Sequence, residues 1–288
     1  MSELSLSSGD CRTEAGTVTW WSAPRTAAYP SQDALAVQLR PGGLPVLRLA
    51  VADGLTTCPR TPEVAGMDGA RYAAHLAVAA VGAQPDVEYA CAQVNRALRD
   101  VPASDGRPLR SRERPTAGLA VVDVPLDGGP LVVSSVYDCE VYVRTDSGWH
   151  DVLPAVRGGE QAAAFLAERD RYRHGNPDAT LAELMDLDAE LLADDPERWG
   201  VVPLGALADV YLRSAVLPRS GPEAVREVVV ASDGAKLTPE RLAGHTVAGW
   251  LRGLREWERG DAGNLDQVKV HDDVSVVRLC LEVATLLR

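Results

Sequence analysis

The sequence predicts an α+β fold in which two antiparallel β-sheets pack face to face with helices outside. β-leaning runs come first, two helix-like stretches follow, and strand-like and helical segments then alternate to the end. No repeat, low-complexity tract or linker divides the 288 residues, so we expect one domain over 1–288, with a flexible N-terminus at 1–15. A content of 46% hydrophobic and 24% charged residues is enough for a sizeable core.

The N-terminal part predicts a hairpin followed by two long helices. Its β-leaning runs are VTWW (18–21), DALAVQLR (33–40) and LPVLRLAVADG (44–54). The RPGG sequence at 40–43 predicts the turn of the hairpin. Helical periodicity then runs from Pro62 to Leu98 and is interrupted at Pro85. The polar stretch at 100–115 predicts an exposed loop.

The second half predicts a β-meander and then mixed helices and strands. The meander comprises the strand-rich runs 118–126, 129–145 and 148–153, which Gly-containing turns separate. Residues 158–217 are expected to be mainly helical, and 226–234 returns to strand. Thr238 is expected to cap a helix that opens with Pro239, and 275–287 forms a last strand.

Charge and composition exclude several classes of partner. The formal net charge is −12 and the carboxylates are spread along the chain, which disfavours nucleic acid. No apolar run of about 18 residues predicts a membrane span, and no basic-then-apolar start predicts an export signal. We therefore expect a soluble, cytoplasmic protein that binds no membrane. The cysteines are scattered singly, without zinc-like spacing, and are expected to be reduced structural thiols.

Acidic residues recur at the edges of the predicted strands. Asp33 begins one strand, Asp53 and Asp233 each end one, and Asp272 and Asp273 precede the last. Carboxylates at strand ends can meet at one rim of a sheet, where their hard oxygen atoms suit Mg²⁺ or Mn²⁺. Two such ions can polarise a phosphoryl group and generate a hydroxide nucleophile. An Asp-Gly pair at a strand end is also an ordinary turn, and both interpretations stay open on these residues alone.

The order of five short motifs resembles the type 2C (metal-dependent, PPM-type) Ser/Thr protein phosphatases, in a divergent bacterial form, over nearly the whole chain. That family has an acidic dipeptide in the first hairpin, strand-Asp-Gly, two helices, a GDSR-like turn, Ser-Asp-Gly, and Asp-Asn or Asp-Asp before a strand. The matching segments are Gln32-Asp33, Val51-Ala52-Asp53-Gly54, Tyr137-Asp138-Cys139-Glu140, Ser232-Asp233-Gly234 and Asp272-Asp273-Val274-Ser275. The resemblance implies a four-layer α/β/β/α sandwich.

The resemblance also implies roles for these residues. Asp53 would bridge two Mn²⁺ or Mg²⁺ ions, with the Gly54 carbonyl as a further ligand. Asp233 and Asp272 would hold one of the ions, and Asp33 would act mostly through metal-bound water. The implied reaction is direct attack of a metal-bridging water on the phosphate of phospho-Ser/Thr, without a covalent phosphoenzyme.

The chain departs from the family pattern in three places. Gln32 replaces the first acidic residue of the dipeptide, and the Thr56-Thr57 segment replaces a glycine-rich turn. Tyr137 and Glu140 flank Asp138, the position that matches a ligand of a looser third metal, where the family has glycine and arginine.

The resemblance therefore implies a phosphoprotein phosphatase that acts on a phosphoprotein substrate and opposes a Ser/Thr kinase. Arg25 is a candidate for gripping the substrate phosphate, in competition with a solvated surface role. The alternative is a catalytically degenerate protein of the same fold that serves as a binding or regulatory module. A third possibility is another acidic metallohydrolase, although no histidine-rich ligand set is present.

Two further features have structural interpretations. His271 abuts Asp272 and could donate to a ligand carboxylate, but a surface histidine before the strand is the favoured interpretation. Trp20 and Trp21 are neighbours on a strand, so we expect one ring to face the core and the other to face the outer helices.

Overall fold

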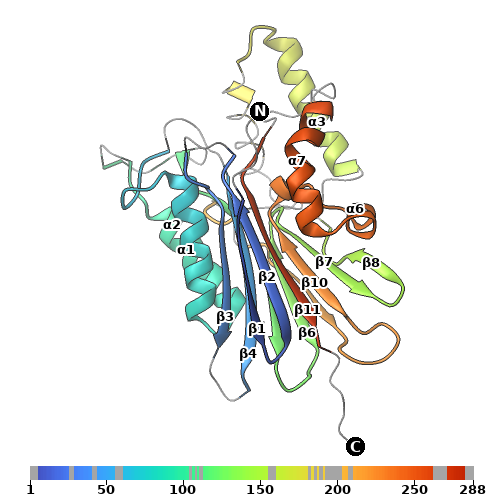
Figure 1. Ribbon diagram of the computed structural model, residues 1–288. Coiled ribbons are helices and arrows are strands. Elements are labelled where there is room, and N and C mark those ends of the chain that lie inside the picture. Colours follow the sequence, from blue (N-terminus) through green and yellow to red (C-terminus); the bar gives the residue numbers. More distant parts are fainter. Residues whose placement is uncertain are drawn as a thin grey trace, which may run out of the picture.

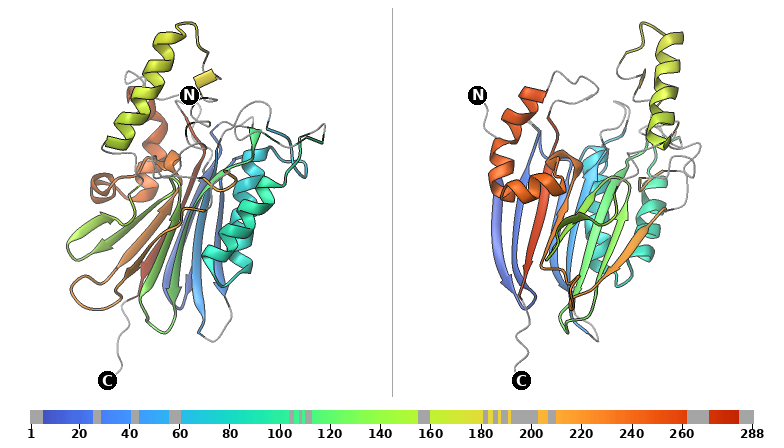
Figure 2. Two further views of the ribbon diagram at one scale, coloured as in Figure 1. Left: turned by 180° about the vertical axis from the view of Figure 1, so that it is seen from behind. Right: turned by 90° about the vertical axis from the view of Figure 1, so that its right-hand side faces the viewer.

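The computed structural model describes residues 6–25, 29–40, 44–55, 61–103, 106–107, 109, 113–154, 160–180, 183–184, 187, 191, 203–206, 210–261 and 271–282. Two antiparallel sheets pack face to face, and helices cover part of each outer face (Figures 1 and 2). The predicted α+β sandwich is confirmed. Within the described ranges, no helix combines the length and apolar character that crossing a bilayer requires.

The first sheet has six strands. In spatial order they are β1 (Ser7–Thr13), β2 (Gly16–Ala23), β11 (Val274–Leu281), β10 (Glu227–Ala231), β7 (Glu140–Thr145) and β8 (Gly148–Asp151). The expectation of a flexible stretch at 1–15 is wrong for β1, which pairs with β2 along its whole length. Its Gly9 faces Trp20, whose ring lies 2.3 Å from where a Cβ atom would stand. The indole therefore covers the edge strand at a position where only glycine fits.

The second sheet has five strands. In spatial order they are β3 (Ala34–Arg40), β4 (Val46–Gly54), β5 (Ala117–Pro125), β6 (Leu131–Val136) and β9 (Arg213–Leu217). The predicted hairpin is confirmed as β3 and β4, which pair from Ala34 with Ala52 to Arg40 with Val46. Strand β9 corrects the expectation of a mainly helical segment at 158–217, because its residues pair with β6.

The predicted β-meander at 118–153 is wrong in its connectivity. Strands β5 and β6 pair in the five-stranded sheet, whereas β7 and β8 pair in the six-stranded one. The chain crosses between the sheets at Tyr137, Asp138 and Cys139, and Tyr137 adopts the left-handed conformation with φ 65°. The local β-pattern predicts strands but does not reveal which sheet each joins. The crossing places Asp138 at the junction of the two sheets.

The two helices predicted over 62–98 are present; the first begins later than expected, and the second begins at Val87, after Pro85, as predicted. They are α1 (Gly69–Ala83) and α2 (Val87–Arg99). Asp68 caps α1 by accepting a hydrogen bond from the Arg71 amide, while Val64 and Met67 pair across a tight turn just before it. In α1, Ala73, Ala74 and Ala77 are buried against the five-stranded sheet, so small side chains let this helix approach closely.

Helices also follow β8 and β10. They are α3 (Glu160–Gly175), the short 3₁₀ helix η2 (Asp233–Ala235), α6 (Pro239–Gly244) and α7 (Val247–Asp261). Thr238 caps α6 by accepting from the Arg241 amide, as expected. Trp21 packs with α6 and α7 outside the six-stranded sheet, and Trp20 packs toward the core between the sheets, which confirms the expected split.

Candidate active site at the sheet rim

Asp33 is buried where the hairpin begins, next to the end of β10. Its Oδ2 atom accepts a 2.7 Å hydrogen bond from Ser232 Oγ, and that hydroxyl in turn accepts from the Ser275 amide at 3.0 Å. Both Asp33 and Ser232 are buried. One serine therefore links the β3–β4 hairpin to β10 and β11, although the sequence pattern drew attention only to the aspartate beside it.

Asp53 and Gly54 end β4 beneath the start of α1. A Cβ atom on Gly54 would stand 2.4 Å from the Ala70 carbonyl oxygen and 2.7 Å from the Gln32 carbonyl oxygen. Both contacts are with backbone, which cannot move aside cheaply. Glycine at this position allows the helix and the hairpin to approach Asp53 from two sides.

Asp233 and Asp272 approach each other through two turns in contact. A Cβ atom on Gly234 would stand 1.8 Å from the Asp273 carbonyl oxygen and 3.2 Å from Asp272 Cβ. Glycine therefore permits the turn after β10 to rest directly on the turn before β11. Asp273 is buried and accepts from the Arg25 and Gln32 amides at 2.6 and 3.0 Å, so it anchors backbone at this rim.

The structure brings these carboxylates within electrostatic reach of one another. Burial, followed by the charges of its neighbours, raises the pKa of Asp53 well above the usual value; those neighbours are Asp33, Asp233, Asp138 and Asp272. Burial likewise raises the pKa of Asp33, against the lowering effect of the Ser232 hydrogen bond and with further raising by Asp273, Asp272 and Asp233. Asp53 keeps part of its surface accessible. The rim thus concentrates carboxylates whose charges oppose one another.

The donor set suits a hard divalent cation. Asp33 Oδ1 is buried and has no hydrogen-bond partner among the described atoms, which is costly for a carboxylate unless another positive group or ion satisfies it. Carboxylate and carbonyl oxygens are the ligands that Mg²⁺ and Mn²⁺ prefer. Among the residues placed, however, no group of three or more His, Cys, Asp or Glu side chains is gathered closely enough to hold an ion. Charge and donor type fit a cation, whereas the described part of the chain does not form a closed ligand cage.

Asp138 belongs to the same rim through the crossing between the sheets. Its side chain is buried, and Gly118 on β5 leaves room for it, since a Cβ there would be 2.8 Å from Asp138 Oδ1. Arg213 on β9 donates to the Tyr137 carbonyl at 2.9 Å and so holds the crossing in place. Burial and the nearby carboxylates raise the pKa of Cys139 well above its usual value, which keeps that thiol neutral.

Three further positions singled out in the sequence are Arg25, Gln32 and the Thr56-Thr57 turn. The Arg25 amide is fixed by Asp273 beside the rim. The Gln32 side-chain amide donates to Asp68 Oδ1 at 3.0 Å, so it supports the cap of α1. The Thr56-Thr57 turn lies outside the described residues.

The contact of His271 with helix α7 was not anticipated. Its Nδ1 atom lies 2.6 Å from Glu258 Oε2, so the expected plain surface role is wrong. Arg255 donates to the same carboxylate at 2.9 Å and to the Asp272 carbonyl at 3.0 Å. Arg255 and Glu258 are both buried, although an i,i+3 pair on a helix usually indicates a solvated face. Helix α7 therefore holds the turn that carries Asp272.

No family model matches the sequence, and no curated protein matches it. Solved structures do share its fold. RsbX in complex with magnesium has a TM-score of 0.53 at 12% identity, over 96% of this chain and 100% of that chain. The S. agalactiae serine/threonine phosphatase has a TM-score of 0.55 at 14% identity, over 96% of this chain and 100% of that chain. Stp1 from Staphylococcus aureus has a TM-score of 0.51 at 11% identity, over 98% of this chain and 96% of that chain. At such identities the likeness shows the fold, that of the bacterial PPM-type phosphatases.

Proposed function

We propose that this chain is a metal-dependent phosphoprotein phosphatase that hydrolyses phospho-Ser/Thr at the aspartate rim. The observation that carries the proposal is the gathering of Asp33, Asp53, Asp138, Asp233 and Asp272. Burial first, and then the charges of neighbours within this set, raise the pKa of Asp53 and of Asp33. These residues come from segments far apart in the sequence. Because mutual repulsion destabilises such a cluster, it is more readily explained by cation binding than by folding.

The proposed ligands for two Mn²⁺ or Mg²⁺ ions are Asp53, the Gly54 carbonyl, Asp233 and Asp272, with Asp33 acting through water and Asp138 toward a third ion. When bound, such cations activate water for attack and neutralise charge on the phosphoryl oxygens. The chain itself orients the donors. Ser232 fixes Asp33 by its hydrogen bond, Asp273 anchors the backbone beside Arg25, and Arg255 holds the Asp272 turn.

The proposed substrate is a phosphorylated protein, the product of a Ser/Thr kinase, and Arg25 is a candidate for binding its phosphate. The two phosphatases and RsbX named above share the fold on which this proposal draws. The proposed reaction needs no cysteine nucleophile, which agrees with the neutral, buried Cys139.

A second candidate function is a degenerate binding module. It is favoured by the lack of a closed ligand cage among the placed residues and by Gln32, whose side chain is engaged with Asp68. Such a protein would bind metal or phosphopeptide without turnover.

The deciding experiment gives purified protein millimolar Mn²⁺ and a phosphothreonine peptide and measures released phosphate. We expect slow hydrolysis that EDTA stops and that Asp53→Asn abolishes. Asp10→Asn, which makes the same change at an exposed site on β1, is the matched control and should keep wild-type activity. If the protein binds Mn²⁺ or phosphopeptide but hydrolyses nothing, the binding-module proposal is favoured over the phosphatase. If it shows neither hydrolysis nor binding, the aspartates are turn and cap residues without a role in metal binding.

A further inference from the structure

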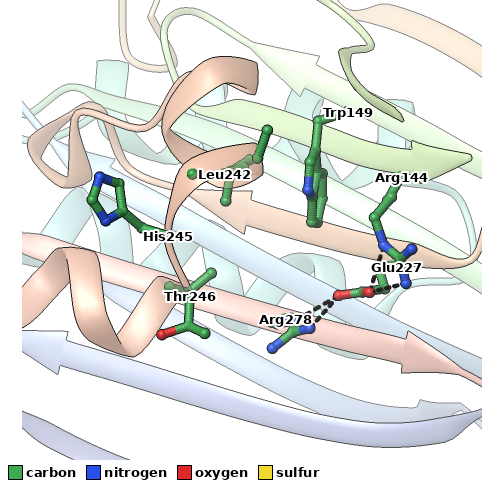
Figure 3. Close-up of a pocket in the computed structure, with 10 residues that line it drawn as sticks. Arg144, Trp149, Glu227, Leu242, His245, Thr246 and Arg278 are labelled. Atoms are coloured by element: carbon green, nitrogen blue, oxygen red, sulfur yellow. Dashed lines mark hydrogen bonds and ion pairs between the residues drawn. The ribbon is translucent and has the colours of Figure 1, made fainter. Parts of the chain in front are cut away.

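A polar pocket lies on the outer face of the six-stranded sheet, away from the aspartate rim. It has a volume of about 360 Å³ and opens where the turn between α6 and α7 overhangs the strands (Figure 3). Glu227 at its base begins β10, whereas Asp233 lies beyond the other end of that strand. From Glu227 to the last residue of β10 is about 13 Å at the rise of a β-strand, so the pocket and the rim are separate.

Two arginines at the base of the pocket are held side by side by one carboxylate. Arg144 Nε donates to Glu227 Oε1 at 2.6 Å, and Arg278 Nε donates to Oε2 at 2.8 Å. Both Nη2 atoms also pair with Glu227. Burial alone would raise the pKa of Glu227, but Arg278 and Arg144 outweigh it and lower that pKa, so the carboxylate is ionised. The trio carries one net positive charge in a chain of net charge −12.

Each guanidinium keeps one edge available. Glu227 occupies Nε and Nη2 of both arginines, while neither Nη1 atom has a hydrogen-bond partner among the described residues. The side chains of Arg144 and Arg278 are 44% and 30% exposed. A shared carboxylate therefore orients two planar donors and leaves one amino group of each, on a partly exposed side chain, without a hydrogen bond to the described residues, which is an arrangement suited to an oxyanion.

The other walls supply an apolar surface and a helix N-terminus. Trp149 stands beside Arg144, with Leu242 of α6 beyond it (Figure 3). Thr246 caps α7 by accepting from the Gly249 amide, and the first turn of this 15-residue helix carries no acidic side chain. The positive end of the helix dipole therefore adds to the arginines.

We propose that this pocket binds a phosphate monoester carried on an apolar group, with the oxyanion on Arg144 and Arg278 and the apolar group against Trp149. A phosphate dianion is favoured over a carboxylate because two guanidinium edges can each donate to it and because its second charge adds attraction. The volume lies at the small end of ligand sites and suits one side chain or a small ester. The proposal does not depend on metal binding or turnover at the rim.

The test is calorimetry with phenyl phosphate in EDTA, which removes any metal-dependent binding at the rim. We expect phenyl phosphate to bind, and to bind more tightly than inorganic phosphate. Arg144→Ala should weaken it at least about tenfold, as expected for loss of a charged hydrogen bond. Arg12→Ala is the matched control, because Arg12 is a 78% exposed arginine on the same sheet that pairs with Glu282 outside the pocket. It should leave binding unchanged.

Trp149→Ala tests the apolar wall separately. It should remove the preference for phenyl phosphate over inorganic phosphate, and thermal unfolding of each variant checks that the fold is retained. If a phosphothreonine peptide binds more tightly than phenyl phosphate, the proposal is supported and the natural ligand is a phosphorylated protein. If phenyl phosphate binds more tightly, the proposal is supported and the natural ligand is a small phosphate ester. Absence of binding by the wild type, wild-type affinity in Arg144→Ala, or equal weakening in Arg12→Ala would overturn it.

Discussion

Asp53→Asn should stabilise the metal-free protein while removing its response to Mn²⁺. Asp53 is partly buried at the rim, and burial together with the charges of four other aspartates raises its pKa. In EDTA those carboxylates repel one another, so neutralising one of them relieves strain in the folded state. When Mn²⁺ is present, the Asp53 carboxylate stabilises the folded protein, because it is a proposed ligand of the ions. The substitution therefore separates stability from ligand binding.

Coulomb's law sets the order of magnitude of this effect. At an effective dielectric constant of about 20, two unit charges about 8 Å apart repel by about 2 kcal/mol. The gain is reduced because some neighbours take up protons without metal and because an asparagine amide needs partners of its own. We therefore expect a net gain of about 1–2 kcal/mol, or about 2–8 °C in Tm.

Thermal unfolding in EDTA and in millimolar Mn²⁺ checks this prediction. Wild-type protein should gain about 3 kcal/mol when Mn²⁺ reaches about 100 times its Kd, whereas Asp53→Asn should gain much less. The reasoning is refuted if Asp53→Asn is less stable than wild type in EDTA yet keeps the full Mn²⁺ shift. Asp53 would then be a structural residue outside any ion site.

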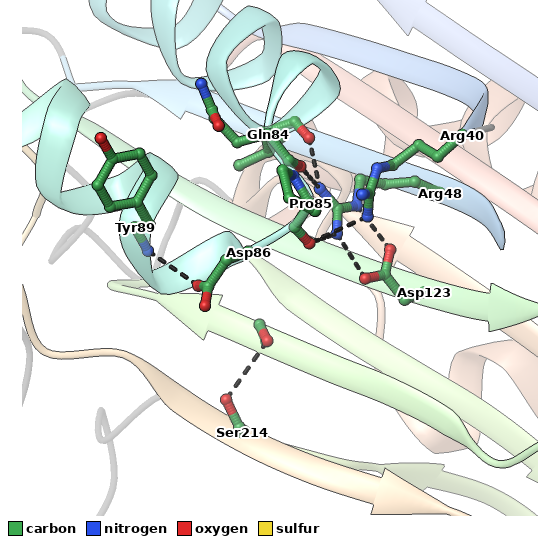
Figure 4. Close-up of polar contacts among 10 residues, drawn as sticks. Arg40, Arg48, Gln84, Pro85, Asp86, Tyr89, Asp123 and Ser214 are labelled. Atoms are coloured by element: carbon green, nitrogen blue, oxygen red, sulfur yellow. Dashed lines mark hydrogen bonds and ion pairs between the residues drawn. The ribbon is translucent and has the colours of Figure 1, made fainter. Parts of the chain in front are cut away.

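Three further predictions test features around the site and in the core. Arg255→Ala should weaken Mn²⁺ binding several-fold in calorimetry, because the turn that carries Asp272 loses its hydrogen bond from Arg255, and Arg255→Lys should have an intermediate affinity. Equal Mn²⁺ affinities in wild type and Arg255→Ala would show that Arg255 does not position this turn. Asp123→Ala should cost about 3–5 kcal/mol in urea unfolding, since it leaves the buried Arg48 guanidinium with backbone carbonyl acceptors but no carboxylate (Figure 4), and a loss below about 1 kcal/mol would contradict this. Burial raises the pKa of Cys91 to about 12, so at pH 8 about one thiol in ten thousand is ionised. Mass spectrometry should find this cysteine unmodified by iodoacetamide until the protein unfolds, and rapid labelling of the folded protein would contradict its burial.

The sequence predicted the parts of the rim that depend on local pattern. Asp33, Asp53 and Asp233 could be recognised because each stands at the edge of an apolar β run, and Thr238 because a cap has a short signature. The close backbone contacts at Gly54 and Gly234 follow from the same Asp-Gly pairs. Local chemistry thus indicated which residues could meet.

Long-range pairing was not predictable in the same way. Strand β1 is short and polar, and its place at the sheet edge depends on pairing with β2 and on the ring of Trp20. The switch of sheets at Tyr137 leaves no periodic signal, because β6 and β7 are both short, mostly buried runs whose sequences do not distinguish one sheet from the other. Arg255 resembles a surface residue until the turn before β11 is placed against α7.

The crossing at Tyr137 also affects how the sandwich can open. The links from β2 to β3 and from β6 to β7 both pass between the sheets at the end where Asp33 and Asp138 lie. The link from β9 to β10 joins the sheets at the opposite end. Sliding of one sheet over the other is therefore most restricted beside the aspartates, and amide hydrogen exchange should be slower at the ends of β4 and β10 near the rim than at their far ends. Covalent connectivity thus gives the carboxylates a rigid frame, which favours a constant spacing between them.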